Sequence, residues 1–167
     1  MGYQFKYHCL LSRMKKFWSI LAQVLTRSSK LIVPARSKAR KRALDFLYEA
    51  EIKKAKALDL LQLRGASELS ESEYVEKLLS GVAEHSTKID ELITTYAQDW
   101  DLDRMPAIDR NILKIAIFEI LWVAEVDLEV ACDEAVELAK SLSTDESAKY
   151  INGVLGRIIK VKDSIAI

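Results

Sequence analysis

The chain has 167 residues, of which half are hydrophobic, and its 25 basic and 25 acidic side chains give no net charge. A single domain of this length buries about two thirds of its surface without disulfide bonds or metal ions. The two cysteines, Cys9 and Cys132, are too few and too far apart to indicate a disulfide framework, so a reducing cytoplasm is the expected setting. Five glycines and two prolines leave little material for turns, which favours long helices.

The charges are unevenly distributed along the chain. Residues 1–44 contain eleven Lys or Arg residues and no acid, whereas residues 45–167 contain fourteen basic and twenty-five acidic residues. A basic end on an acidic body predicts a polyanion as partner at one end and is compatible with a basic protein partner elsewhere.

Residues 1–34 do not share the regular pattern of the rest of the chain. The stretch MKKFWSILAQVL resembles a weak signal peptide, but TRSSK follows where small cleavage-site residues belong, so export is not expected. Two interpretations remain: a basic amphipathic helix that contacts a membrane or RNA, or an extension produced by a start codon assigned too early. We favour the second, because the regular pattern begins beside Leu31 and Val33, either of which can be read from an alternative initiation codon. Mass spectrometry of the mature N-terminus distinguishes the two.

The first regular element begins at Ala35 and is expected to be one helix that stops at Gly65. Small and apolar residues repeat on one of its faces at helical spacing. The residues of this buried face are Ala39, Ala43, Leu47 and Ala50.

Residues 72–98 predict two helices separated by a bend. Ser70 with Glu73 forms a capping box for the first, and Ser86 and Thr87 offer a cap for the second. The apolar residues expected to face the core are Val75, Leu78, Leu79, Val82, Ile89, Leu92, Ile93 and Tyr96.

The stretch 105–124, MPAIDRNILKIAIFEILWVA, predicts the central helix of the fold. After Pro106, which suits a first helical turn, it is apolar almost all the way round, and such a helix must be enclosed by others. Charged residues interrupt the apolar run well short of the ~20 residues that a bilayer requires, so this is a core helix and not a membrane span. The polar interruptions are Asp109, Arg110, Asn111, Lys114 and Glu119.

Two more helices follow the acidic turn EVDLE. The first carries Ala131, Ala135, Leu138, Ala139 and Leu142 on one face, and the second carries Tyr150, Val154, Leu155, Ile158 and Ile159. Ser143 with Glu146 forms a capping box between them. Because no segment alternates with a period of two and no repeat of 20 to 50 residues is present, the pattern predicts an all-α compact bundle of six or seven helices.

Catalytic and metal sites are not indicated. Neither His8 nor His85 stands at a metal-ligand spacing from cysteines or carboxylates. The sequence also has no phosphate-binding glycine loop and no recognisable nucleophile triad. We therefore expect that the protein is not an enzyme and binds no metal and no cofactor. Gly153 and Gly156 form a G-x-x-G pattern inside a helix, which favours close helix packing over an RNA clamp of the KH type. Cys132 is expected to be a half-buried small apolar residue.

The informative cluster is ARSKARKR, in which five basic residues stand at a helix N-terminus. Cations at a helix N-terminus are unfavourable in a free helix because they oppose the helix dipole. The arrangement is expected where the helix end and the cations bind the same phosphates. Arg36 and Arg40 share one ridge of the helix, and Lys41 and Tyr48 share a neighbouring ridge, where Tyr48 can stack on an unpaired base. A solvated helix end remains the alternative for the basic run, and core packing is an equal alternative for Tyr48. The five cations are Arg36, Lys38, Arg40, Lys41 and Arg42.

Two stretches together resemble the family of the bacterial transcription antitermination factor NusB. They are ARSKARKRALDFLYEAE and, further on, IDRNILKIAIFEI followed by ACDEAVELAKSLSTDESAKYINGVLGRI. The resemblance covers about residues 35–160, so we expect a NusB-like domain over 35–163, an N-terminal extension over 1–34 and a tail over 164–167. It implies seven helices in two helical subdomains.

The resemblance also implies partners and site residues. The family binds the boxA element of nascent RNA as a pair with NusE, a small-subunit ribosomal protein, and joins other Nus factors and RNA polymerase to promote read-through in ribosomal RNA operons. Asp109 and Glu146 match acidic positions of the NusE contact; their alternative roles are a first-turn dipole residue and a capping-box residue. The matching RNA-binding positions are Arg36, Lys38, Arg40, Lys41, Tyr48, Lys149 and Tyr150, with Ser37 where the family often has another arginine.

Two alternatives of other classes remain. One is an RNA-binding helical domain related to ribosomal RNA cytosine methyltransferases, which the absence of a following α/β domain and of a Gly-rich cofactor loop disfavours. The other is a helical adaptor whose basic arm touches acidic lipid, although no membrane partner is expected. Whether the body is a monomer or a homodimer stays open, as do the exact bases of the RNA.

Overall fold

The computed structural model describes residues 35–64, 72–98, 100 and 104–165. The chain divides into two compact units, Met1–Arg36 and Ser37–Ile167. The interpretations of residues 1–34, the helix stop at Gly65 and the cap at Ser70 lie outside the described residues.

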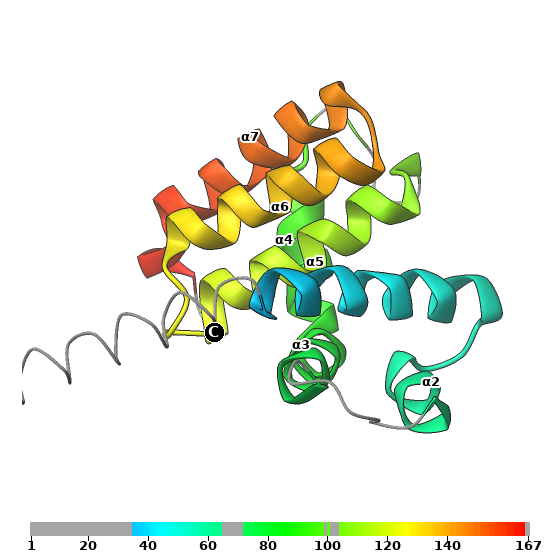
Figure 1. The fold of residues 1–167 in the computed structure, drawn as a ribbon. Helices are drawn as coiled ribbons and strands as arrows, with labels where there is room; N and C mark the ends of the chain where they lie inside the picture. Colours follow the sequence, from blue (N-terminus) through cyan, green and yellow to red (C-terminus); the bar gives the residue numbers. More distant parts are fainter. Residues whose placement is uncertain (1–34, 65–71, 99, 101–103, 166–167) are drawn as a thin grey trace, which may run out of the picture. The chain divides into compact units, whose positions relative to one another are not determined.

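The described part of the chain consists of helices and connecting turns, with no strand, which confirms the all-α prediction (Figure 1). It begins with a helix over residues 35–53, called here the basic helix. Then follow α2 (Ala57–Leu63), α3 (Ser72–Glu84), α4 (Ser86–Tyr96), α5 (Ala107–Trp122), α6 (Leu128–Leu142), α7 (Asp145–Val161) and the short 3-10 helix η2 (Lys162–Ser164). None of these helices combines the length and the hydrophobicity needed to cross a bilayer.

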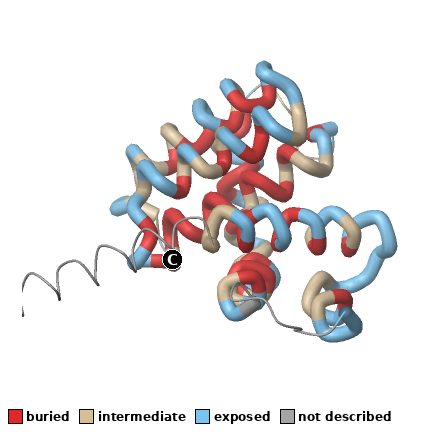
Figure 2. Tube along the Cα trace, in the orientation of Figure 1, coloured by how far each residue is buried: buried red, intermediate tan, exposed pale blue. Residues whose placement is uncertain are grey.

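Helix α5 is the centre of the core, as its sequence predicts. It packs against α3, α4, α6 and α7, and eleven of its sixteen residues are buried (Figure 2). Three of the buried residues are polar, namely Asp109, Asn111 and Glu119. The surrounding helices therefore supply partners for polar groups as well as apolar contacts.

The predicted apolar faces lie inward in most positions. Ala39, Ala43 and Ala50 of the basic helix are buried, while Leu47 is half-buried. Tyr96, Leu142, Tyr150 and Ile159 are also half-buried, and the other residues predicted for the faces of α3, α4, α6 and α7 are buried.

Helices α3 and α5 approach each other at a glycine. A Cβ atom added at Gly81 would lie 2.0 Å from Cζ of Phe118, so the ring occupies the space that a side chain would take. Next to this contact, the rings of His85 and Trp122 stack with centroids 4.1 Å apart.

The single helix predicted from Ala35 to Gly65 is wrong, because the chain turns after residue 53 and restarts as α2. Lys54 adopts a left-handed conformation with φ of 51°. The amide of Ala55 donates to the carbonyl of Ala50 over 2.9 Å, and the amide of Lys54 donates to the carbonyl of Glu51 over 3.3 Å. This is the Schellman ending of a helix, in which lysine takes the place usually held by glycine, so the sequence carries no glycine signal for it.

Two predicted caps differ in the structure. The N-cap of α7 is Thr144 and not Ser143, because the Thr144 hydroxyl accepts from the Ser147 amide over 3.1 Å. Neither Ser86 nor Thr87 caps α4, whose N-cap position is His85 without a side-chain cap bond. The backbone amide at this position is already bonded to α3, because the His85 amide donates to the Gly81 carbonyl over 3.0 Å.

The prediction that Gly153 and Gly156 mark close helix packing is wrong. A Cβ atom at either position would have no atom of a neighbouring element within 4 Å. The G-x-x-G pattern therefore does not bring α7 close to another helix.

Candidate nucleic-acid interface

The basic helix exposes three of its cations on one side. Lys38, Lys41 and Arg42 are exposed, and the guanidinium of Arg42 lies 5.7 Å from the centroid of the Phe46 ring. Because residues three or four positions apart are neighbours on a helix surface, these side chains form a continuous cationic strip. Such a strip suits the phosphates of a nucleic acid.

Tyr48 continues this strip toward the C-terminal end of the basic helix. It follows Lys41 by two helical turns and is 39% exposed, which places it among the exposed large hydrophobic side chains. The alternative that Tyr48 is a core residue is wrong, since its neighbours Leu44 and Phe46 are buried and it is not. An exposed aromatic ring beside cations is suited to stacking on an unpaired base.

Arg40 does not belong to the exposed strip, and its expected place on an RNA-facing ridge is wrong. Its side chain is only 2% exposed. The Nε atom donates to both carboxylate oxygens of Glu119 on α5, at 3.0 and 2.9 Å. The physical reason is the helical turn of 100° per residue, which directs Arg40 toward the core while Lys38 and Lys41 face outward.

Three more polar groups surround this ion pair. The Nη1 atom of Arg40 lies 3.3 Å from Oε2 of Glu134 on α6, and the Ser37 hydroxyl donates to Oε1 of the same carboxylate over 2.6 Å. The Tyr74 hydroxyl on α3 donates to Glu119. The cluster of Ser37, Arg40, Tyr74, Glu119 and Glu134, called here the arginine cluster, thus links the basic helix to three other helices.

The electrostatics of the arginine cluster keep Arg40 charged. Burial by itself lowers the pKa of the Arg40 guanidinium, but the hydrogen bond and the charge of Glu119, together with the smaller effects of Tyr74 and Glu134, outweigh burial and hold that pKa above its ordinary value. A buried cation is tolerated where an anion and hydrogen bonds meet it, and Glu119 supplies both.

Arg36 lies in the first described turn of the basic helix and is the last residue of the N-terminal unit. The other candidate residues belong to the start of α7. Glu146 and Lys149 are exposed there. Tyr150 is half-buried, with its ring edge-on to Trp100 at a centroid distance of 5.0 Å and an angle of 75°. The structure therefore groups the candidates on two helices, the basic helix and α7.

The prediction that Asp109 contacts a partner protein directly is wrong, because its side chain is 0% exposed. It lies in the first turn of α5, and its Oδ2 atom accepts from the Ser147 hydroxyl of α7 over 2.6 Å. Asp109 therefore joins two helix N-termini inside the bundle, where a carboxylate is favoured by both dipoles.

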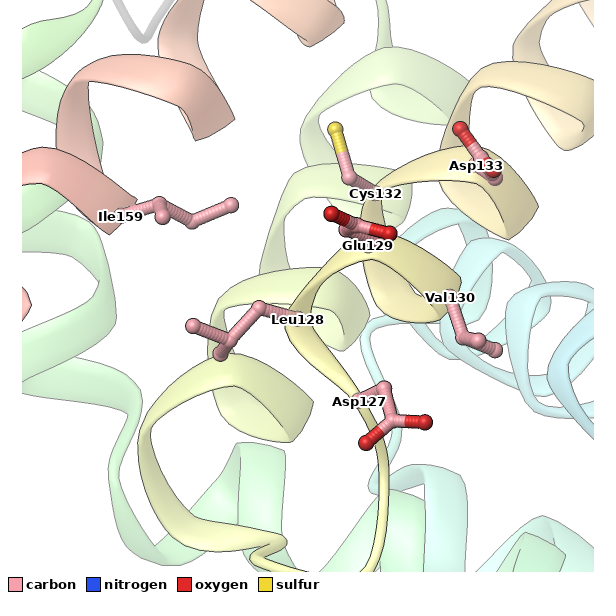
Figure 3. A pocket seen from close by; sticks show the side chains of 7 residues that line it. All are labelled: Asp127, Leu128, Glu129, Val130, Cys132, Asp133 and Ile159. Carbon is pink, nitrogen blue, oxygen red and sulfur yellow. The ribbon is translucent and has the colours of Figure 1, made fainter.

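A surface hollow at the start of α6 is lined by both acidic and apolar side chains (Figure 3). The Cys132 thiol in this hollow donates to Oδ1 of Asn152 over 3.3 Å. Burial, together with the charge of Asp133, raises the pKa of the thiol, so it is a poor nucleophile at neutral pH, in agreement with the structural role expected for it. In the described part of the chain, no three His, Cys, Asp or Glu side chains gather to hold a metal ion. The hollow is lined by Asp127, Leu128, Glu129, Val130, Cys132, Asp133 and Ile159.

Sequence patterns do not identify Tyr74, Glu119 and Glu134 as part of the site. A signal existed for Glu119, since it interrupts a helix that is apolar almost all round and a buried carboxylate requires a counter-charge. No comparable signal exists for Tyr74 and Glu134, whose roles depend on how α3 and α6 are placed in space.

Comparison with known proteins identifies relatives over nearly all of the described residues. A family model described as the NusB family matches residues 37–160. The transcription antitermination protein NusB of Salinispora arenicola is 48% identical over an alignment of 132 residues that covers 75% of this chain and 96% of that protein.

Solved structures give the same result for the fold. The NusB structure of T. maritima matches with a TM-score of 0.69 and 31% identity, covering 75% of this chain and 90% of that one. A crystal structure of the antitermination factors NusB and NusE in complex with dsRNA matches with a TM-score of 0.68 and 23% identity, covering 77% of this chain and 98% of that one. At that identity the second match supports the fold alone.

Proposed function

The chain belongs to the NusB family, and we propose on that premise that it is a transcription antitermination factor whose activity is binding and not catalysis. The observation that carries this proposal is the match to curated antitermination proteins at nearly half identity over almost their whole length. The same coverage disfavours the alternative of a methyltransferase-related domain, because these relatives have very little length outside the matched part.

The proposed ligand is single-stranded boxA RNA, bound together with the ribosomal protein NusE. In this proposal Lys38, Lys41 and Arg36 contact phosphates, which fix the position of the strand, while Tyr48 stacks on an unpaired base. Lys149 and Tyr150 on α7 provide a second contact with the RNA.

The proposed contact with NusE includes Glu146, which is exposed in the first turn of α7. The acidic balance of residues 45–167 supports a basic protein partner. The resulting complex acts in the cytoplasm, where it joins other Nus factors and RNA polymerase and promotes read-through in ribosomal RNA operons.

Fluorescence anisotropy tests this proposal. The full chain is titrated into a labelled boxA-like RNA and into a scrambled RNA of equal length, with and without NusE, over a range of salt concentrations. We expect preference for the boxA-like RNA, tighter binding with NusE and weaker binding at high salt, with a log-log slope of about −2 for three phosphate contacts to a single strand. Equal, weak binding to both RNAs that NusE does not change would contradict the proposal.

Liposome binding tests the remaining alternative, the adaptor that touches acidic lipid. Sedimentation of the chain with anionic vesicles, but not with neutral vesicles, would support that alternative. We expect no binding to either kind of vesicle at physiological salt.

A further inference from the structure

We propose that Arg40 is a positioning residue, which sets the rotation of the basic helix on the bundle and thereby directs Lys38 and Lys41 outward. This inference rests on the proposed function, in which those two lysines bind RNA. It assigns to the arginine cluster a role in recognition although the Arg40 and Glu119 side chains at its centre are buried.

The contacts of Arg40 are directional. Its Nε atom meets both oxygens of Glu119 at 3.0 and 2.9 Å, and its Nη1 atom lies 3.3 Å from Oε2 of Glu134. Because the guanidinium is planar and its donors point in fixed directions, carboxylates on α5 and α6 can contact it together in only a narrow range of helix orientations.

The apolar contacts of the same turns are less restrictive. The basic helix presents Ala39 and Ala43 to the core at this end, and both are fully buried. Alanine contacts are short and non-directional, so they hold the helix against the bundle without strongly selecting its rotation. Larger apolar side chains, Leu44 and Phe46, are buried further along the helix. In the turn around Arg40 the ion pair is therefore the directional contact that selects the rotation.

The rotation of the helix decides which cations face solvent. A turn of 100° separates neighbouring residues, so Lys38 lies nearly opposite Arg40 and Lys41 lies to one side. Rotation by one residue would move Lys41 toward the bundle or lift Arg40 out of it, and either change would break up the cationic strip. Arg40 thus acts on RNA only through the lysines that it positions.

Two further members of the arginine cluster hold the carboxylates in place. The Tyr74 hydroxyl donates to Glu119, and the Ser37 hydroxyl donates to Glu134 over 2.6 Å. Carboxylates held in this way are already oriented toward the guanidinium. Tyr74→Phe and Glu134→Gln therefore weaken the positioning without leaving Arg40 unpaired, since the bonds to Glu119 remain.

The test compares RNA affinity and its salt dependence for full-length variants that circular dichroism shows to be folded. Arg40→Lys keeps the charge but loses the planar fork, and we expect its RNA affinity to fall about tenfold, as for one lost charge-assisted bond. Glu134→Gln and Tyr74→Phe should reduce the affinity by smaller factors. Lys140→Gln, an exposed change on α6, is the control and should have no effect.

The salt slope separates positioning from direct contact. The double variant Arg40→Gln with Glu119→Gln keeps the net charge and removes the ion pair. Introduced into a chain that already carries Lys38→Gln and Lys41→Gln, it should leave the slope of that chain unchanged, because the lysines that Arg40 positions are absent. Lys41→Gln should make the slope less steep by about 0.7, as expected for one lost phosphate contact to a single strand. A further loss of slope of about 0.7 when the double variant is added to the two lysine variants would show that Arg40 itself contacts phosphate, which would overturn the inference.

Hydrogen exchange gives a reading that does not depend on RNA. In Arg40→Lys and Glu134→Gln, amides of residues 37–42 should exchange faster than in the unchanged chain, while those of α4 should not change. Unchanged exchange and unchanged affinity in both variants would overturn the inference alone. If Lys38→Gln and Lys41→Gln also leave RNA binding unchanged, the proposed function of the basic helix fails instead.

Discussion

The hydroxyl of Ser147 donates a hydrogen bond of 2.6 Å to Oδ2 of Asp109, and both residues are almost completely buried. This bond joins the first turn of α7 to the first turn of α5. Ser143 donates to the Ser147 hydroxyl over 3.1 Å, so the group continues to the end of α6. Three helix ends are thus held together by side chains, of which the sequence pattern assigns Ser143 to a cap and Asp109 to a partner contact.

Ser147→Ala should destabilise the fold by about 1–3 kcal/mol, because it leaves a buried carboxylate without its hydroxyl donor. Urea unfolding followed by circular dichroism measures the change. Ser80→Ala is a suitable control, since the Ser80 hydroxyl donates only to carbonyls of its own helix. Equal stability of Ser147→Ala and the unchanged chain would show that the bond contributes nothing.

Gly81 and Gly153 should respond to alanine in opposite directions. Gly81→Ala places a Cβ atom inside the Phe118 ring position, and we expect a loss of about 1–3 kcal/mol from overpacking. Gly153 lies on the exposed side of α7 with no neighbour within 4 Å, so Gly153→Ala should stabilise the chain by about 0.5–1 kcal/mol through helix propensity. Thermal unfolding of both variants in one buffer gives the comparison, and a shift of the same sign in both would contradict it.

The fold was predictable because apolar spacing marks the inner face of each helix, and Ala39, Val75, Ile115 and Val154 lie where that spacing places them. The site was less predictable, because helical spacing shows that a charged residue lies on an inner face but not which distant helix supplies its counter-charge. Arg40 was assigned to RNA for this reason, although the carboxylate of Glu119, 79 residues away, binds it.

A similar limit applies to the end of the basic helix. Lys54 has a left-handed conformation that glycine adopts at little cost, while other residues lose about 1–2 kcal/mol there. Lys54→Gly should therefore stabilise the chain by roughly 0.5–1 kcal/mol, after the greater freedom of glycine in the unfolded chain is subtracted. Urea unfolding measures this, with Lys54→Ala as the control, because alanine keeps the Cβ atom that makes the left-handed conformation unfavourable. A destabilised Lys54→Gly would show that the lysine side chain contributes more than the backbone strain costs.

Tyr48 offers a test of how the basic helix recognises RNA. Its ring is exposed, so Tyr48→Ala should leave stability nearly unchanged and reduce RNA affinity by about 1–3 kcal/mol if one base stacks on it. Tyr48→Phe should bind almost as the unchanged chain does, because stacking uses the face of the ring and not the hydroxyl. The matched control is Ile52→Ala, an exposed apolar residue one turn further along the same helix, which should not affect binding. Since Tyr48 carries no charge, the salt slope of RNA binding should stay the same in Tyr48→Ala. A less steep slope would assign the effect to a displaced helix and not to stacking. Equal losses of RNA affinity in Tyr48→Ala and Ile52→Ala would do the same.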